Sequence, residues 1–354
     1  MKATERKKIL VAPLNWGLGH ASRCVVIVNF LIENNFEPVI ASDGDALVFF
    51  RKEFPDLKYH ELPSYDIKYS KKRSLLKLKL LFSSFSIIKA VREEQSIVEK
   101  LVKQEKFHGI ISDNRFGVLH ASIPSVYMTH QLCVLSGHTT FLTSFIHQRI
   151  VSKFDECWVP DCKGENSLGG KLSMKQMKNN ISIKYLGPIS RLQFVDVEKK
   201  YDLLIVLSGP EPQRTLLEVK LLQEIKKFEG KVALVRGVLS ASEITDVSDD
   251  VDIFNYVLTH KVQELINQSE IVISRSGYSS IMDLWKLGKK AFFIPTPGQS
   301  EQEYLAEFMR SRNIAPYANQ KDFKIEYLDQ LATYSGFEEN QNIELDKSLL
   351  QIFK

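Results

Sequence analysis

Three side chains in the first half of the chain have the chemistry of a proton acceptor, and each follows a strand-like apolar run. His20 stands in a glycine-containing loop after the first run, and Asp113 and His130 follow two later ones. An imidazole at such a position can take a proton near neutral pH. The sequence favours His20 as the base of a reaction and leaves His130 and Asp113 as the alternatives.

The loop that carries His20, NWGLGHASR, is suited to an anionic ligand. Gly17 and Gly19 let the backbone turn sharply and approach a ligand. The free N–H groups of the helix that begins there favour negative charge. Trp16 and Arg23 complete the predicted loop site. The alternative is a tight strand–helix turn with a capping histidine, and the third glycine of a dinucleotide-binding fingerprint is missing.

A similar loop, LSGPEPQR, follows an apolar run in the second half of the chain. Gly209 and Arg214 lie in this loop, where backbone amides and a guanidinium could bind a pyrophosphate. The alternative is a loop that its two prolines shape for structural reasons alone.

The most specific motif is ISRSGYSSIMDLWKLG, a strand that ends in Arg275-Ser276-Gly277 and a helix that begins at the glycine. The helix N-terminus is again available for phosphate. Asp283 lies two turns into the helix, where a carboxylate can accept hydrogen bonds from a ribose diol. The loop after the next strand brings two further candidates to the same rim, Gln302 and Glu303. The alternative is an ordinary strand–helix–strand unit.

The elements that must position these residues alternate between strands and helices. We expect strands at Lys8–Ala12, Glu37–Ala41, Gly109–Ser112, Ser125–Met128, Glu156–Val159, Ile183–Leu186, Asp202–Leu207, Lys231–Val235, Ile253–Asn255, Ile271–Ser274 and Ala291–Ile294. We expect helices at Ala21–Glu33, Gln213–Phe228, Ser279–Leu287 and Glu301–Arg312. Continuous apolar runs are typical of parallel strands that are buried on both faces. The sequence therefore predicts an α/β fold.

The chain is predicted to form two domains, because 354 residues exceed the usual length of one. The mixed, charged segment Gly187–Lys200 precedes a fresh strand and marks the boundary. This gives residues 1–187 and 188–354, two doubly wound Rossmann-like domains that face each other across a cleft. Whether residues 340–354 return to the first domain stays open.

These motifs together resemble the inverting glycosyltransferases of the GT-B fold. The chain looks most like glycosyltransferase family 28, typified by the enzyme that adds N-acetylglucosamine to the lipid-linked peptidoglycan precursor. The resemblance is strong over Ile271–Tyr304, moderate over Val11–Arg23 and weak between them.

The resemblance implies roles for several residues. Ser276 and Gly277 would face the nucleotide diphosphate, and Asp283 takes the place of a ribose-binding glutamate. Gln302 and Glu303 stand where the family has a pair of polar residues, usually two glutamines, on the donor sugar. The aspartate, the glutamate and Trp16 in the first loop are departures from the family pattern.

The expected function is inverting transfer of a sugar from a UDP-linked donor to a hydroxyl acceptor, such as a lipid-linked or other cell-envelope glycan precursor. The first alternative is a hydrolase of nucleotide sugars on the same scaffold, since the sequence GLGHASR fits the Gly-x-Gly-His-x-x-Arg loop of such enzymes. The second is a non-catalytic protein that binds sugar nucleotides. The resemblance implies no cofactor and no metal, although DGD at residues 43–45 and DDVD at residues 249–252 could pass for ion motifs.

Charge is distributed unevenly. Residues 67–92 hold eight Lys or Arg and no acid, interleaved with Leu, Ile and Phe. Such a stretch is typical of peripheral contact with an anionic membrane, and the alternative is a core-packed helix with a basic outer face. Residues 116–148 hold no Asp, Glu, Lys or Arg, and we expect buried strand, loop and helix around a polar site there. His138 and His147 are expected to be ordinary polar contacts.

Composition narrows the setting of the protein. The net charge of +4 is too small to indicate nucleic acid, and stacking platforms for single strands are absent. Four irregularly spaced cysteines suggest reduced thiols, and the polar start of the chain has no apolar core of signal-peptide length. We expect a cytoplasmic protein, peripheral at the inner face of the membrane if the basic stretch binds lipid. The oligomeric state stays open.

Overall fold

The computed structural model describes residues 6–65, 76–135, 140–174, 181–238, 249–338 and 344–354, with side chains from residue 86 onward in the helix that begins at Leu76. The chain divides into two compact units. Unit 1 comprises Met1–Ile189 and Ile343–Lys354, and unit 2 comprises Ser190–Asn342.

Unit 1 is built on a parallel sheet in the order β3-β2-β1-β4-β5-β6-β7. Its strands are β1 (Lys7–Pro13), β2 (Phe36–Ser42), β3 (Lys58–Glu61), β4 (Phe107–Asp113), β5 (Ser125–Met128), β6 (Glu156–Val159) and β7 (Ser182–Tyr185). The central strands are apolar on both faces, and Leu10, Val39 and Ile110 lie in one buried cluster. The order reverses between β1 and β4, which is where doubly wound sheets open a site at their carboxyl ends.

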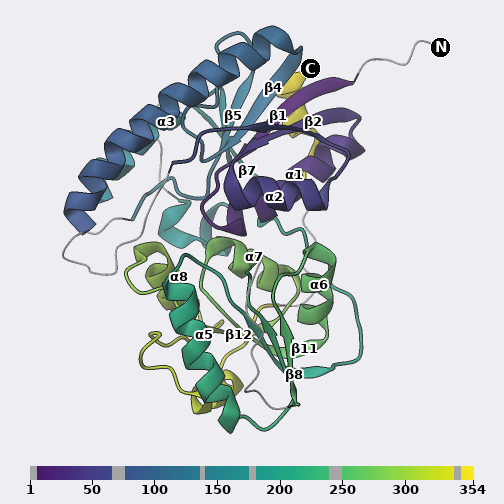
Figure 1. Cartoon of the computed structure of the whole chain (residues 1–354), viewed down its shortest axis with the longest axis vertical. Coiled ribbons are helices and arrows are strands. Elements are labelled where there is room, and N and C mark those ends of the chain that lie inside the picture. The colour runs from purple at the N-terminus through teal and green to yellow at the C-terminus, as the bar shows by residue number, and fades with distance from the viewer. Residues whose placement is uncertain (1–5, 66–75, 136–139, 175–180, 239–248, 339–343) are drawn as a thin grey trace. The chain divides into compact units, whose positions relative to one another are not determined.

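The helices of unit 1 connect these strands. They are α1 (Leu18–Glu33), α2 (Gly44–Glu53), α3 (Leu76–Gln104) and α4 (Thr140–Val151), and short 3₁₀ turns follow at Gly164–Asn166, Gly170–Leu172 and Lys347–Phe353. In Figure 1, α3 is the long helix that runs along one side of this unit. Within the described residues, no helix is both long and apolar enough to cross a membrane.

Unit 2 is built on a smaller parallel sheet that is also doubly wound, in the order β10-β9-β8-β11-β12. Its strands are β8 (Tyr201–Val206), β9 (Val232–Val235), β10 (Val251–Phe254), β11 (Ser269–Ser274) and β12 (Lys290–Phe293). Its helices are α5 (Gln213–Glu224), α6 (Thr259–Asn267), α7 (Tyr278–Lys286) and α8 (Ser300–Ser311), with 3₁₀ segments at Ile225–Lys227 and Ile325–Thr333. The switch point lies between β8 and β11.

The predicted strands and helices are all present in the structure within one to three residues at each end, with one exception: the predicted helix Gln213–Phe228 ends as α5 at Glu224 and continues as the 3₁₀ segment Ile225–Lys227. Strand β3 was not predicted, because its sequence KYHE is polar and its residues are half-buried or exposed. Among the described strands it pairs with β2 alone, so as an edge strand it does not need the apolar run that identifies a central strand.

The basic stretch 67–92 is described only in part. Residues 67–75 lie outside the described residues, and the remainder begins α3. The charge-free stretch 116–148 was expected to be buried, and β5 is. The outer side of α4 is not, and its apolar side chains are exposed.

The last described residues complete unit 1 rather than unit 2. Lys7 Nζ donates to the carbonyl oxygens of Phe353 (3.2 Å) and Lys354 (2.8 Å). The Phe353 ring is buried and lies edge-on to Trp158, with ring centroids 6.2 Å apart. A Cβ atom on Gly109 would collide with this ring, so β4 needs a glycine there. In Figure 1 the yellow C-terminal segment lies beside β1 and β4.

We predict that Gly109→Ala and Phe353→Ala are coupled. Alone, Gly109→Ala should destabilise unit 1 by about 1–3 kcal/mol through overpacking, and Phe353→Ala by about 3–5 kcal/mol through the cavity it leaves. Together they should cost less than the sum, because the new methyl group enters the space of the lost ring. Hydrogen exchange of the β1 and β4 amides in the four proteins measures this, and simple additivity would contradict it.

Candidate functional site

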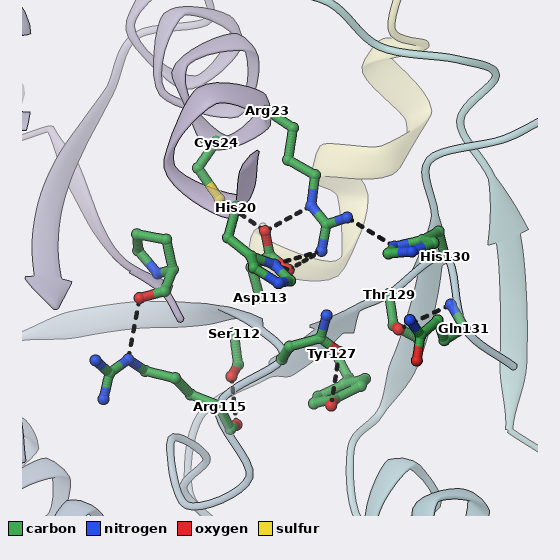
Figure 2. A network of polar contacts seen from close by, with 12 residues as sticks. His20, Arg23, Cys24, Ser112, Asp113, Arg115, Tyr127, Thr129, His130 and Gln131 are labelled. Carbon is green, nitrogen blue, oxygen red and sulfur yellow. Dashed lines mark hydrogen bonds and ion pairs between the residues drawn. The ribbon is translucent and has the colours of Figure 1, made fainter. Parts of the chain in front are cut away.

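A cluster of charged side chains lies at the carboxyl edge of the first sheet, at its switch point. Asp113 is the last residue of β4, and the loop after β1 leads into α1. Gly17 ends that loop with φ 72°, a left-handed conformation that suits glycine. The first turn of α1 then carries His20, and Arg23 follows one turn later, so both side chains reach Asp113 (Figure 2).

Arg23 and Asp113 form a buried ion pair at the centre of the cluster. Arg23 Nε donates to Asp113 Oδ2 at 2.7 Å, and Nη2 donates to Oδ1. Their side chains are 1% and 0% exposed, so water contributes little to either charge. Cys24 Sγ donates a further weak bond to Asp113 Oδ2 at 3.4 Å. Both carboxylate oxygens are therefore engaged.

His20 contacts both members of the pair through Nδ1, which lies 3.0 Å from Asp113 Oδ1 and 2.8 Å from Arg23 Nη2. A ring nitrogen cannot donate and accept at once. If Nδ1 carries the proton it donates to the carboxylate, and Nε2 becomes the nitrogen able to take a proton. This is the arrangement of a base oriented by a carboxylate.

Burial and the neighbouring charges shift the pKa values of His20 and Asp113. Burial lowers the pKa of His20 below its usual value; Asp113 opposes this effect and Arg23 adds to it. Burial would raise the pKa of Asp113, but Arg23 and His20 outweigh burial and hold that pKa well below its usual range. At neutral pH the cluster therefore contains a neutral imidazole beside an ionised carboxylate.

His130 stands on the other side of Arg23, in the loop after β5 (Figure 2). Its Nδ1 lies 2.9 Å from Arg23 Nη1. A guanidinium only donates, so His130 Nδ1 must accept and the ring proton sits on Nε2. His20 Nδ1 faces Arg23 in the same way, but it also lies 3.0 Å from Asp113 Oδ1 and can donate to that carboxylate when it carries the proton. This second contact favours His20 as the base.

A second buried network, which the sequence analysis did not find, supports the loop before α1. Arg115 is 0% exposed and binds Asp43 through Nη2 and Glu94 Oε1 through Nη1 at 2.6 Å. The other Asp43 oxygen accepts from Asn15 Nδ2 at 3.2 Å. Tyr65 donates to Glu94 Oε2 at 2.7 Å. The sequence carries no local signal for this network, because Glu94 and Asp43 lie 21 and 72 positions from Arg115 in the chain.

This network fixes the position of Trp16. Both polar atoms of the Asn15 side chain are hydrogen-bonded, because Nδ2 donates to Asp43 and Oδ1 accepts from the Ala46 amide at 3.3 Å. The next residue, Trp16, is 45% exposed. Gly17 has open space around it, with no atom within 4 Å of a Cβ built there. The loop thus presents an indole ring close in sequence to His20.

In unit 2 the loop residues at the switch point hold one another. Ser276 is buried, and its Oγ donates to the Gln302 carbonyl oxygen at 2.8 Å. Gln302 Oε1 in turn accepts from the Thr296 amide at 2.8 Å. Gly277 is the N-cap residue of α7 and makes no side-chain capping hydrogen bond. The positive end of the helix dipole lies there.

Thr296 is the unusual member of this group. Its Oγ1 is buried and has no hydrogen-bond partner. A Cβ on Gly209, whose φ is 101°, would lie 3.6 Å from that oxygen. A buried hydroxyl without a partner is costly unless a ligand completes its hydrogen bonds. Gly209 and Thr296 thus mark one spot at the carboxyl edge of the second sheet.

The two arginines predicted to bind the donor are engaged with protein atoms. Arg275 is buried, and its Nη atoms donate to the oxygens of Ile294, Pro295, Gln213 and Gln320 at 2.8–3.2 Å. Burial lowers its pKa to about 10. Arg214 donates to Glu211 Oε1 at 2.6 Å and pairs with Glu218. In this structure both tie loops together, and a contact with diphosphate stays a prediction.

Asp283 and Glu303 also have protein partners. Asp283 Oδ1 accepts from Ser190 Oγ at 2.5 Å. Burial raises its pKa, and Arg191 and Ser190 counter this in part. Glu303 Oε1 accepts from the Gly298 amide at 3.0 Å. Glu303 also borders a depression of about 470 Å³, whose other lining residues are Leu216, Lys220, Pro295, Pro297, Asn319, Gln320 and Lys321.

The acidic motifs that could pass for metal sites are used otherwise. Asp43 binds Arg115 and Asn15, and Asp252 accepts from Tyr201 Oη at 2.6 Å. In the described part of the chain, no three His, Cys, Asp or Glu side chains come together in a way that could hold a metal ion. The expectation of no metal and no cofactor stays a prediction.

Comparison with known proteins gives these sites a context. Residues 206–351 match the glycosyltransferase family 28 C-terminal domain. The chain is 22% identical over 333 residues to the UDP-N-acetylglucosamine--N-acetylmuramyl-(pentapeptide) pyrophosphoryl-undecaprenol N-acetylglucosamine transferase of Haemophilus ducreyi, which covers 91% of this chain and 88% of that protein. It is 25% identical over 329 residues to an uncharacterized glycosyltransferase of Methanosarcina mazei, and the alignment covers 84% of this chain and 81% of that protein.

Solved structures show the same fold. The calicheamicin glycosyltransferase CalG4 has a TM-score of 0.63 at 10% identity and covers 99% of this chain and 93% of its own. MurG of Acinetobacter baumannii has a TM-score of 0.53 at 13% identity, covering 92% and 90%. The predicted GT-B fold, the resemblance to family 28 and the enzyme class, a glycosyltransferase, are confirmed.

We predict that Asp113→Asn destabilises unit 1 by about 3–5 kcal/mol, because it leaves the buried Arg23 charge unpaired. Since the folded pKa of Asp113 lies below its unfolded value, the contribution is complete above pH ~4 and is lost as pH falls further. Hydrogen exchange of the β1 amides should show a constant gap to wild type from pH 5 to pH 8 and a narrowing gap in acid.

The matched control is Asp45→Asn, since Asp45 is an exposed aspartate of the same unit. It should change stability by less than about 1 kcal/mol. An equal effect of the two substitutions would show that the ion pair contributes nothing special.

Proposed function

We propose that this glycosyltransferase of the GT-B fold moves a sugar from a UDP-linked donor to a hydroxyl acceptor in a single inverting displacement. The observation that carries the proposal is the cluster of His20, Asp113 and Arg23 at the switch point of the first sheet. It supplies a neutral imidazole, oriented by an ionised carboxylate, at the edge where doubly wound sheets bind ligands.

In the proposed reaction His20 is the base. The acceptor oxygen attacks the anomeric carbon, its proton passes to His20 Nε2, and the bond from that carbon to the diphosphate oxygen breaks with its electron pair leaving on the diphosphate. Asp113 stabilises the imidazolium that forms. Because Arg23 occupies both carboxylate oxygens, Asp113 is a poor nucleophile. This supports one displacement with inversion over two displacements through a covalent intermediate.

The donor is assigned to unit 2. The amides at the start of α7, after Gly277, would stabilise the departing diphosphate electrostatically. Thr296 Oγ1 supplies a buried hydroxyl without a partner, which a phosphate oxygen would satisfy. Ser276 donates to the Gln302 carbonyl and so positions that residue. We assign the donor sugar to the depression that Glu303 borders. The proposal needs no metal ion.

The acceptor is assigned to unit 1. The name of the Haemophilus ducreyi relative contains a pyrophosphoryl-undecaprenol acceptor, and we extend that class, a lipid-linked glycan precursor, to this chain as a proposal. The same holds for a cytoplasmic location at the inner face of the membrane, with residues 67–92 in peripheral contact with lipid.

The experiment is a turnover assay with UDP-N-acetylglucosamine, the donor in that relative's name, with and without a lipid-linked glycan acceptor. Transfer that requires acceptor supports the proposal. UDP released at the same rate without acceptor means a nucleotide-sugar hydrolase. Binding of UDP without turnover on a broad donor panel means a binding protein.

We predict that His20→Gln lowers kcat by about 10²–10⁴-fold and leaves UDP affinity unchanged in calorimetry. The acid limb of the pH profile of kcat/KM should lie below the usual histidine value near 6.5, because the pKa of His20 is lowered. His130→Gln is the control and should keep that limb. If His130→Gln abolished the limb and His20→Gln did not, the assignment of the base would be wrong.

We predict that Thr296→Val weakens UDP binding by about 0.5–1.5 kcal/mol, because the hydroxyl loses its ligand partner. Thr259→Val is the matched control, since Thr259 Oγ1 is also buried without a partner but lies on α6. Calorimetric titration of UDP into the three proteins measures this. Equal affinities would remove Thr296 from the donor site.

Asp283→Ala belongs to the same titration. Loss of about 1.5–3 kcal/mol would support a ribose contact despite the bond from Ser190. An unchanged affinity would leave Asp283 with the structural role of holding Ser190.

A further inference from the structure

Helix α4 has an inverted distribution of polarity. The side chains it buries are mostly polar, namely Ser144, His147, Gln148 and Val151. The opposite side is apolar and open to solvent: Phe141 is 75% exposed, Leu142 58%, Phe145 44% and Ile146 50%. We call Phe141, Leu142, Phe145 and Ile146 the outer face of α4. A surface helix of a water-soluble unit normally shows the reverse pattern.

The polar inner side has a structural reason. Ser144 Oγ accepts from the Val134 amide at 3.0 Å, and Gln148 Nε2 donates to the Leu132 carbonyl at 3.5 Å. His147 Nε2 lies 3.2 Å from Tyr127 Oη. These contacts hold the segment that follows β5, the one that carries His130. The inner side of α4 therefore makes hydrogen bonds to the segment after β5. The outer face is exposed and does not pack in the core of the unit.

The charges around the outer face suit an anionic partner. Between Asp113 and Asp155 the sequence holds no Asp or Glu. Arg149 lies one turn beyond Phe145, with its guanidinium carbon 5.6 Å from the centre of that ring, and Lys153 is exposed just after the helix. Apolar side chains next to Lys and Arg, without acids, are typical of helices that lie in the interface of an anionic membrane.

We propose that the outer face of α4 docks on an anionic lipid bilayer. This surface is distinct in sequence from residues 67–92. The proposal rests on the proposed function in one respect: the helix that docks also holds the His130 loop on the acceptor side, which suits an acceptor that is delivered from a membrane. The docking itself can be measured without donor or acceptor.

The test is flotation of the full-length protein with vesicles of equal parts phosphatidylglycerol and phosphatidylcholine. Wild type should bind, and vesicles of phosphatidylcholine alone should bind more weakly. Phe141→Ser/Phe145→Ser should lower the affinity roughly tenfold or more. The matched control is Ile32→Ser/Val219→Ser on α1 and α5, where the two side chains are 39% and 53% exposed, and it should bind like wild type.

A second measurement locates the contact. In Ile146→Trp, vesicles with brominated acyl chains should quench the new fluorescence and shift it to the blue, relative to the same titration of wild type. This readout does not depend on the stability of the serine variant. UDP calorimetry on the same samples reports the donor site, so a failure of docking is distinguishable from a failure of the proposed function.

Three outcomes would overturn the docking proposal. Wild type could fail to bind the anionic vesicles. It could bind equally well after Phe141→Ser/Phe145→Ser but not after Lys71→Gln/Lys72→Gln/Arg73→Gln, which would assign binding to residues 67–92. It could also self-associate in the absence of lipid, in sedimentation, with the serine variant remaining monomeric. The outer face would then be an interface between two copies of this chain.

Discussion

The site in unit 1 depends on the mutual neutralisation of Arg23 and Asp113. Each charge is almost fully removed from water, and neither would be stable there alone. Their pairing fixes the direction of both side chains, and with it the chemistry of two histidines. Arg23 contacts both rings, and His20 also lies beside the ionised Asp113, which can orient its ring. The ion pair thus positions both histidines and gives His20 a carboxylate to donate to.

Unit 2 positions its loops at the switch point in a different way. Its loops at the switch point are held by hydrogen bonds to backbone atoms, such as Ser276 to the Gln302 carbonyl and Gln302 to the Thr296 amide. Arg275 does the same for the loops around Gln213 and Gln320. These bonds set the loops before a ligand arrives, so binding pays little reorganisation. The Thr296 hydroxyl is a group that this framework leaves without a protein partner.

The strands and helices could be predicted from the sequence more fully than the side-chain contacts of the site. Apolar runs bounded by Gly, Pro or Asp identified the central strands, because burial on both faces leaves a strong local pattern. The edge strand β3 has no such pattern and was missed. His20, Asp113 and His130 were found as candidates from their places after strands, but their roles depend on Arg23, whose partners lie 90 and 107 positions away in the chain. The pairing of Arg115 with Glu94 is long-range as well, and so are the partners of Asp283 and Arg275. Arg214 differs, because its acidic partners Glu211 and Glu218 lie three and four residues away in the chain.

The return of the C-terminal segment to unit 1 has a consequence for how the protein is made. Phe353 fills the space that Gly109 leaves on β4 and contacts Trp158, so the first unit contains a part of its core that is translated after the whole of unit 2. During synthesis the core of the seven-stranded sheet stays incomplete until Phe353 is translated, whereas all five strands of the second sheet are translated before that residue. Folding on the ribosome therefore cannot follow the simple order from the first domain to the second. For the same reason no single cut in the chain separates the two units into intact halves.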